Sequence, residues 1–311
     1  MYYEAAVKLT QRKELCYMHF YGTIWRPPYE AHSLLIQATA GCTHHACKFC
    51  TLYDDLPFKF RMSPLSEVEE DLAEAKKHVR RVDRIFFVGA NPFVLRTDKL
   101  KALAALARSY YPDYRSIGCF GRITDITPKS VEELRELQAL GYDGLTLGVE
   151  TGDDAALSFM NKGYTSQDIL QQCRKLEKAG ISYNFFYLTG IAGAGKGVES
   201  ARRTAAVFNQ LQPKVIDASM LTIYANSRLY QEIQQGNWQE PGELEKLREL
   251  QALIAALNIK TRFATDGASN LVQVRGCLPQ DKELLVNGLE RLLAKADEKS
   301  LRDYRVHLKH L

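Results

Sequence analysis

The chain has 311 residues, of which 46% are hydrophobic and 25% charged, a composition typical of a folded globular protein rather than a disordered one. Its net charge of +4 comes from 41 basic and 37 acidic residues that form no long basic tract, so nucleic-acid binding is not indicated. No apolar run approaches the roughly 20 residues that span a bilayer, and the first residues lack the apolar core of a secretion signal. We therefore expect a cytoplasmic protein without membrane association.

Short apolar segments rich in β-branched and aromatic residues alternate with amphipathic segments from residue 33 onward. Several amphipathic segments end in glycine before the next apolar run, as helices often do. The alternation predicts βα units and a parallel sheet with both faces covered. We expect strands at 33–39, 84–89, 115–120, 144–150, 183–190 and 215–224. We expect helices at 66–79, 98–110, 130–141, 166–180 and 199–211.

The alternating pattern changes after residue 225. Two further helices are expected, at 242–257 and 280–296, and the charged segment 295–305 has the composition of a solvent-exposed helix face. We expect an α/β protein with an N-terminal extension (1–32), a barrel of parallel strands (33–225) and a helical C-terminal extension (226–311).

Cysteines carry the strongest chemical signal. Three of the seven, Cys42, Cys47 and Cys50, are spaced Cys-x4-Cys-x2-Cys in a loop directly after the first expected strand, where α/β barrels place their chemistry. Three thiolates this close can hold a small iron–sulfur cluster and leave one iron without a protein ligand. No second cluster is expected, because the others are scattered: Cys16, Cys119, Cys173 and Cys277.

A structural zinc site is the main alternative for this loop. Structural zinc is bound by four ligands, and His44 or His45 could supply the fourth. A protein of this kind would be a metal-binding module without catalysis.

The cysteine loop resembles that of the radical S-adenosylmethionine (SAM) superfamily. In that family three cysteines follow the first strand of a partial (β/α)6 TIM-like barrel, and an aromatic residue precedes the last cysteine, as Phe49 does here. The commonest spacing has three residues between the first two cysteines, whereas four stand here, from Thr43 to Ala46. The resemblance implies one [4Fe-4S] cluster bound by Cys42, Cys47 and Cys50, with SAM as the second cofactor.

The same resemblance implies which residues contact SAM. Gly89, Ala90 and Asn91 follow the second strand, where a turn of small residues lets a ligand approach the backbone, although the common Gly-Gly-Glu form is absent. Glu150 ends the fourth strand and corresponds to the group that hydrogen-bonds the ribose. A carboxylate there needs a partner, because burying an unpaired charge is costly. Lys162, twelve residues later, corresponds to the group that meets the SAM carboxylate.

The fifth strand runs into a glycine-rich segment with two interpretations. The resemblance implies that Leu188 and Gly190, with Ile223 on the sixth strand, approach the adenine of SAM. The sequence GIAGAGKG at 190–197 is also similar to a phosphate-binding P-loop, but Gly197 replaces the required Ser or Thr. A P-loop-like ATPase that uses Lys196 therefore remains an alternative.

Together these patterns predict a radical SAM enzyme, whether oxidoreductase, transferase or lyase. It would reductively cleave SAM to a 5′-deoxyadenosyl radical that abstracts hydrogen from a substrate that the sequence does not specify. The expected partners are a small-molecule substrate and an electron donor such as flavodoxin or ferredoxin. The candidates for lining the substrate space are Arg61, Arg122, Asn184 and Tyr187.

Overall fold

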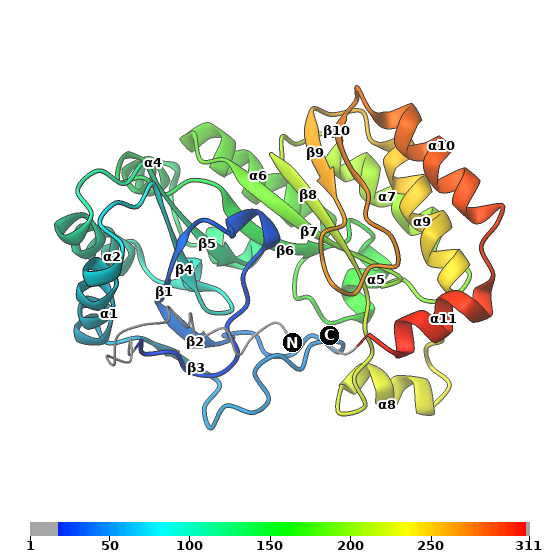
Figure 1. Ribbon diagram of the computed structural model, residues 1–311, viewed down its shortest axis with the longest axis horizontal. Helices are drawn as coiled ribbons and strands as arrows, with labels where there is room; N and C mark the ends of the chain where they lie inside the picture. The colour runs from blue at the N-terminus through cyan, green and yellow to red at the C-terminus, as the bar shows by residue number, and fades with distance from the viewer. Residues whose placement is uncertain (1–17, 309–311) are drawn as a thin grey trace.

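The computed structural model describes residues 18–308, and Cys16 with most of the expected N-terminal extension lies outside them. A curved eight-stranded sheet forms the centre of the described part, and helices cover its outer face (Figure 1). In order across the sheet, the strands are β1 (Leu34–Gln37), β4 (Arg84–Val88), β5 (Ser116–Gly121), β6 (Leu145–Glu150), β7 (Tyr183–Thr189), β8 (Val215–Met220), β9 (Thr261–Ala264) and β10 (Arg275–Leu278).

The predicted fold class is confirmed. All six expected strands form and are parallel to their neighbours, and β1 and β10 are the two edges of an open sheet rather than the seam of a closed barrel. The C-terminal extension contains, besides its helices, two strands that were not predicted: β9 pairs parallel with β8, and β10 pairs antiparallel with β9. These strands satisfy backbone groups that the edge of β8 would otherwise leave unpaired.

The helices follow the amphipathic segments, and several of them begin at local capping groups. Ser130 and Glu133 form a capping box on α4, and Thr165 and Asp168 form one on α6, which ends at Gly180 in the left-handed conformation. No helix in 18–308 is long and apolar enough to cross a membrane. The helices are α1 (Leu65–His78), α2 (Thr97–Tyr110), α3 (Ile123–Ile126), α4 (Val131–Ala139), α5 (Asp154–Phe159), α6 (Ser166–Ala179), α7 (Gly197–Phe208), α8 (Arg228–Gln234), α9 (Glu243–Ala256), α10 (Lys282–Leu293) and α11 (Glu298–Val306), with short 3-10 turns η1 (Pro28–Glu30) and η2 (Pro92–Val94).

Strand alternation separates a packed outer face from an inner face. On β7, Tyr183, Phe185 and Tyr187 are buried in the main hydrophobic core beneath the helices. Because successive side chains point to opposite sides of a strand, Phe186 and Leu188 face the interior of the curved sheet. Both are only partly buried. The interior is therefore partly open to solvent near the carboxyl end of β7.

Residues that precede the first strand close the other end of the interior. The Tyr29 hydroxyl lies 2.9 Å from Oγ1 of Thr146 on β6. The buried Glu30 carboxylate forms an ion pair of 2.7 Å with Arg84 at the start of β4. These contacts attach η1 to the amino ends of the strands, so access to the interior is from the carboxyl ends.

The first expected strand divides into two in the structure. β1 ends at Gln37, and the chain continues as β2 (Thr39–Gly41), which pairs antiparallel with β3 (Phe60–Met62). Gly41 has a φ of +75°, and a Cβ there would lie 2.2 Å from the carbonyl oxygen of Lys59. The cysteine loop is therefore the connection of a short hairpin beside the main sheet.

Replacing Gly89 by alanine is expected to destabilise the protein by at least about 3 kcal/mol. Gly89 has a φ of +129°, and a Cβ would lie 2.2 Å from Oγ1 and 2.3 Å from the carbonyl oxygen of Thr39. The control is Gly180→Ala, because Gly180 has a φ of +78° and nothing lies within 4 Å of the position that an added Cβ would take. Only the backbone cost of about 1 to 2 kcal/mol applies at Gly180. Urea unfolding of both variants measures the difference, and equal losses would contradict it.

Candidate active site

The three clustered cysteines are free thiols, and each is partly buried. Burial raises the pKa of Cys50 to about 12. Burial also raises the pKa of Cys47, although the nearby cations Lys162 and Arg122 oppose that rise. Metal binding requires thiolates and displaces their protons. The two cations therefore favour the charge state in which Cys47 binds a metal.

Segments from distant parts of the chain hold the cysteine loop in place. The Lys48 amide donates a hydrogen bond of 3.1 Å to the carbonyl of Met160, and the Asn161 side chain donates one of 3.0 Å to the carbonyl of Ala46. On the other side, the Leu229 amide of α8 donates a hydrogen bond of 2.7 Å to the carbonyl of Lys48. The loop is thus fixed between the end of α5 and the start of α8.

The histidines of the loop are engaged with groups other than a metal. Nε2 of His44 lies 2.6 Å from the carbonyl oxygen of Asn161, and burial lowers the pKa of the ring. Nε2 of His45 lies 2.8 Å from the Asp54 carboxylate. Among residues 18–308, no three His, Cys, Asp or Glu side chains are gathered closely enough to hold a single metal ion. Both histidines that could supply a fourth zinc ligand therefore already have a partner within the protein.

Glu150 and Lys162 form an ion pair at the carboxyl end of β6. Nζ of Lys162 donates hydrogen bonds of 3.2 Å to the Glu150 carboxylate and 3.0 Å to the carbonyl of Gly148. Glu150 has a φ of +66°, where the pairing of β6 with β7 shifts register. Such backbone strain in a residue other than glycine is concentrated at functional sites. Burial lowers the pKa of Lys162, but Tyr164 and Glu150 outweigh that effect and raise it.

An apolar wall completes this end of the interior. Nζ of Lys162 lies 5.7 Å from the centre of the Phe49 ring. Phe49, Leu188 and Ile223 all pack against one set of buried residues, which we call the second apolar cluster. That cluster consists of Ala156, Met160, Ile191, Ala192, Leu221, Leu229 and Trp238. The structure thus brings Phe49 of the cysteine loop together with Leu188 of β7 and Ile223, which follows β8.

The small-residue turn after β4 supports the cysteine loop. Asn91 is fully buried, and its amide group donates hydrogen bonds of 2.8 Å to the Thr43 hydroxyl and 3.1 Å to the Asp125 carboxylate. Burial raises the pKa of Asp125 to about 6. Gly89 is packed against β2, so Ala90 is the most exposed residue of the three. The side-chain amide of Asn91 is therefore used in hydrogen bonds within the protein.

Backbone amides of the glycine-rich segment after β7 are also used in hydrogen bonds within the protein. The amide of Gly190 donates a hydrogen bond of 2.9 Å to Glu249, and the amide of Gly195 donates one of 2.6 Å to Glu245. Glutamate side chains therefore accept the hydrogen bonds that a P-loop offers to phosphates. Lys196 is exposed at the start of α7. This arrangement argues against the P-loop ATPase.

One protein-family model matches the sequence of this chain. The model of the radical SAM superfamily matches residues 36–198, more than half of the chain. The chain belongs to the radical SAM superfamily. It is therefore an enzyme, as the cysteine loop predicts. No curated protein matches its sequence.

Solved structures of radical SAM proteins share the fold of this enzyme. The radical SAM methyltransferase TsrM from Kitasatospora setae, bound to tryptophan and a SAM analogue, is 20% identical with a TM-score of 0.53, over 67% of this chain and 40% of that one. Coproporphyrinogen III oxidase (HemN) from Escherichia coli is 19% identical with a TM-score of 0.53, over 72% and 51%. Methylornithine synthase (PylB) is 15% identical with a TM-score of 0.53, over 83% and 68%. The enzyme spans about half or less of the first two proteins.

The residues proposed to line the substrate space are placed differently from one another. Tyr187 donates its hydroxyl hydrogen to Glu249 and so points toward α9, away from the interior. Arg122 hydrogen-bonds the carbonyl of Lys162, beside the ion pair of the site. Asn184, two residues before Phe186 on β7, shares the inner face. Glu249 was not among the predicted residues, because a glutamate on a helix gives no signal of burial.

A double-mutant cycle of Glu150→Gln and Lys162→Met is expected to give a coupling energy of at least about 1 kcal/mol. The side chains are 15% and 5% exposed, so either single change leaves a charge with little water to solvate it. The control cycle uses the exposed pair Lys101 and Glu136, for which we expect less than about 1 kcal/mol. Urea unfolding measures all variants. Equal coupling in the two cycles would show that Glu150 and Lys162 are not a buried pair.

Glu249→Gln is expected to reduce the loss of stability that follows a rise in pH. Burial raises the pKa of Glu249 from 4.5 to about 8, so between these values the folded state binds more protons than the unfolded state. Its contribution to stability is therefore present below about pH 4.5 and is lost as the pH rises to about 8. Thermal unfolding of the wild type and the variant at about pH 5 and about pH 8 measures the effect. Glu245→Gln, on the same helix but partly exposed, is the control, and parallel profiles for wild type and Glu249→Gln would contradict the assignment.

Proposed function

We propose that the enzyme reductively cleaves SAM at one [4Fe-4S] cluster held by Cys42, Cys47 and Cys50. When bound, the cluster supplies the electron that splits SAM into methionine and a 5′-deoxyadenosyl radical, which abstracts hydrogen from the substrate. The observation that carries this proposal is the position of three free, partly buried thiols beside the Glu150–Lys162 pair, within the segment that matches the family. The set of soft thiolates fits iron–sulfur ligation.

In this proposal the polar groups of the site orient SAM. The ammonium group of Lys162 lies beside the cysteine loop, as the 5.7 Å separation from the Phe49 ring shows, and would neutralise the SAM carboxylate. Glu150 would accept hydrogen bonds from the ribose hydroxyls. The ion pair between Glu150 and Lys162 fixes both groups before a ligand binds, which lowers the cost of ordering them.

Apolar and backbone groups would form the rest of the SAM site. Phe49, Leu188 and Ile223 offer the apolar surface against which an adenine ring can stack and from which water is excluded. Ala90, the most exposed residue of its turn, would meet the SAM amino group through its backbone. The role of Gly190 is to fix the backbone after Leu188, because its amide is bound to Glu249.

The organisation of the chain and its surroundings form part of the same proposal. Residues 33–225 would be the catalytic barrel, and residues 1–32 and 226–311 its extensions. A small-molecule substrate would enter at the carboxyl ends of the strands, and a flavodoxin or ferredoxin would supply the electron in a reducing cytoplasm.

Replacing Cys42, Cys47 and Cys50 together by alanine tests the proposal. After anaerobic reconstitution, the wild type is expected to hold about four irons and four sulfides per chain, and the triple variant almost none. Formation of 5′-deoxyadenosine from SAM with dithionite is expected to fall to background. Cys277→Ala removes an exposed cysteine far along the chain and should keep both properties. SAM cleavage by the triple variant, or about eight irons in the wild type, would refute the single-cluster assignment.

A further inference from the structure

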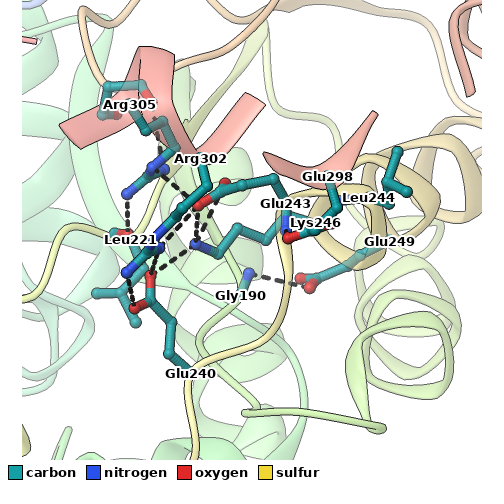
Figure 2. Close-up of polar contacts among 11 residues, drawn as sticks. Gly190, Leu221, Glu240, Glu243, Leu244, Lys246, Glu249, Glu298, Arg302 and Arg305 are labelled. Atoms are coloured by element: carbon teal, nitrogen blue, oxygen red, sulfur yellow. Dashed lines mark hydrogen bonds and ion pairs between the residues drawn. The ribbon is translucent and has the colours of Figure 1, made fainter. Parts of the chain in front are cut away.

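A network of buried charges joins the C-terminal helix α11 to α9 (Figure 2). Glu243 and Lys246 of α9 are fully buried. Nζ of Lys246 lies 2.8 Å from the Glu240 carboxylate and 3.2 Å from that of Glu243. From α11, the guanidinium of Arg302 bonds both carboxylates at 2.8 Å. Each buried charge therefore has a partner of opposite sign, as the low polarity of the site requires.

The same helix supplies the cap that α9 lacks. Gly242, at the N-terminal cap position of α9, has no side chain to accept the first amide hydrogens. The Glu298 carboxylate of α11 accepts them instead, from the amides of Glu243 at 2.6 Å and Leu244 at 2.8 Å. A carboxylate at this end also interacts favourably with the helix dipole. The position of α11 against α9 is thus set by several directional contacts.

Arg305 extends this network to the backbone of the barrel. Its side chain is 5% exposed, and Nε lies 3.4 Å from the Glu243 carboxylate. Nη2 donates a hydrogen bond of 2.8 Å to the carbonyl of Leu221, directly after β8, and Nη1 donates one of 3.4 Å to the carbonyl of Ser269. Figure 2 shows the guanidinium reaching from α11 to Leu221. One planar group with five donors serves three acceptors, which a lysine ammonium cannot do with the same geometry.

Leu221 links the strand ends that carry the apolar wall. Its amide donates a hydrogen bond of 2.9 Å to the carbonyl of Thr189 at the end of β7, next to Leu188. Its side chain belongs to the second apolar cluster, against which Leu188 and Ile223 pack. The peptide of Leu221 is therefore held between β7 on one side and Arg305 on the other.

We infer that Arg305 is a positioning residue that holds Leu221, and through it Ile223 and Leu188, in the arrangement that receives the adenosine part of SAM. This inference rests on the proposed function for the nature of the ligand, and on the contacts of Arg305 for the positioning itself. The family match ends at residue 198, so the segment that completes this wall lies outside the matched region.

Three variants test the inference on the anaerobically reconstituted enzyme. Arg305→Met keeps the length of the side chain and removes all three contacts, whereas Arg305→Lys keeps the charge near Glu243 but loses the fork that binds Leu221. Arg302→Met is the matched control, because Arg302 is on the same helix and also bonds Glu243, together with Glu240, but donates no hydrogen bond to Leu221 or Ser269. Binding of S-adenosylhomocysteine and SAM is measured by equilibrium dialysis, and amide hydrogen exchange is measured for residues 221–224.

Both Arg305 variants are expected to weaken SAM binding by about tenfold, a change of about 1.4 kcal/mol, and to raise KM for SAM more than they lower kcat. Exchange at residues 221–224 is expected to be faster in both, while Arg302→Met keeps wild-type affinity and exchange even where its Tm falls. Wild-type SAM affinity in both Arg305 variants, or the same loss in Arg302→Met, would overturn the inference.

The outcome also separates this inference from the proposed function. If the wild type does not bind SAM, the proposed function fails, and the exchange measurement alone decides whether Arg305 holds residues 221–224. Faster exchange confined to the Arg305 variants would then support the positioning role without the ligand. If Arg305→Met does not fold, Arg305→Lys provides the same comparison with the buried charge retained.

Discussion

The shape of the cysteine loop depends on hydrogen bonds from outside it. An irregular loop has few backbone partners of its own, and here the carbonyl of Met160, the side chain of Asn161 and the amide of Leu229 supply them. Met160 and Asn161 directly precede Lys162, whose ammonium group binds Glu150. The same short segment therefore fixes the metal-binding loop and the charged pair relative to each other. A site assembled from two βα units acquires a single geometry in this way.

Much of the fold could be predicted from the sequence because its signals are local. Runs of β-branched and aromatic residues marked the six parallel strands, and glycines such as Gly180 marked helix ends. The division of the first strand could not be predicted, because no proline or glycine stands between Gln37 and Thr39 to mark a break. The strands β9 and β10 depend on the free edge of β8, which lies about forty residues away in the chain.

The sequence offered candidate site residues but did not predict their contacts. The cysteines were candidates from their spacing, and Glu150 and Lys162 from the family resemblance. The sequence assigned the two charged residues to different parts of a ligand and did not show that they bind each other. It also gave no sign that Gly190 uses its amide to bind Glu249, because that contact joins residues 59 apart in the chain. Tertiary contacts of this kind leave no periodic signal.

The charged segment 295–305 shows most clearly that tertiary contacts cannot be predicted from local composition. Its composition is that of a solvent-exposed helix face, and part of it is exposed. Arg305 is nevertheless buried, because Glu243, 62 residues earlier, provides a counter-charge in the core. Whether an arginine lies in water or in the interior is decided by such distant partners.

The position of α9 in the structure affects how the chain can fold while it is being synthesised. Leu247, Leu250 and Leu253 of α9 belong to the main hydrophobic core, which they share with the strands of the barrel. A nascent chain that ended near residue 225 would leave this core uncovered and the edge of β8 unpaired, two features that promote aggregation. Residues 243–256 thus complete the core that the first strands begin, so the barrel cannot finish folding until this segment has been synthesised.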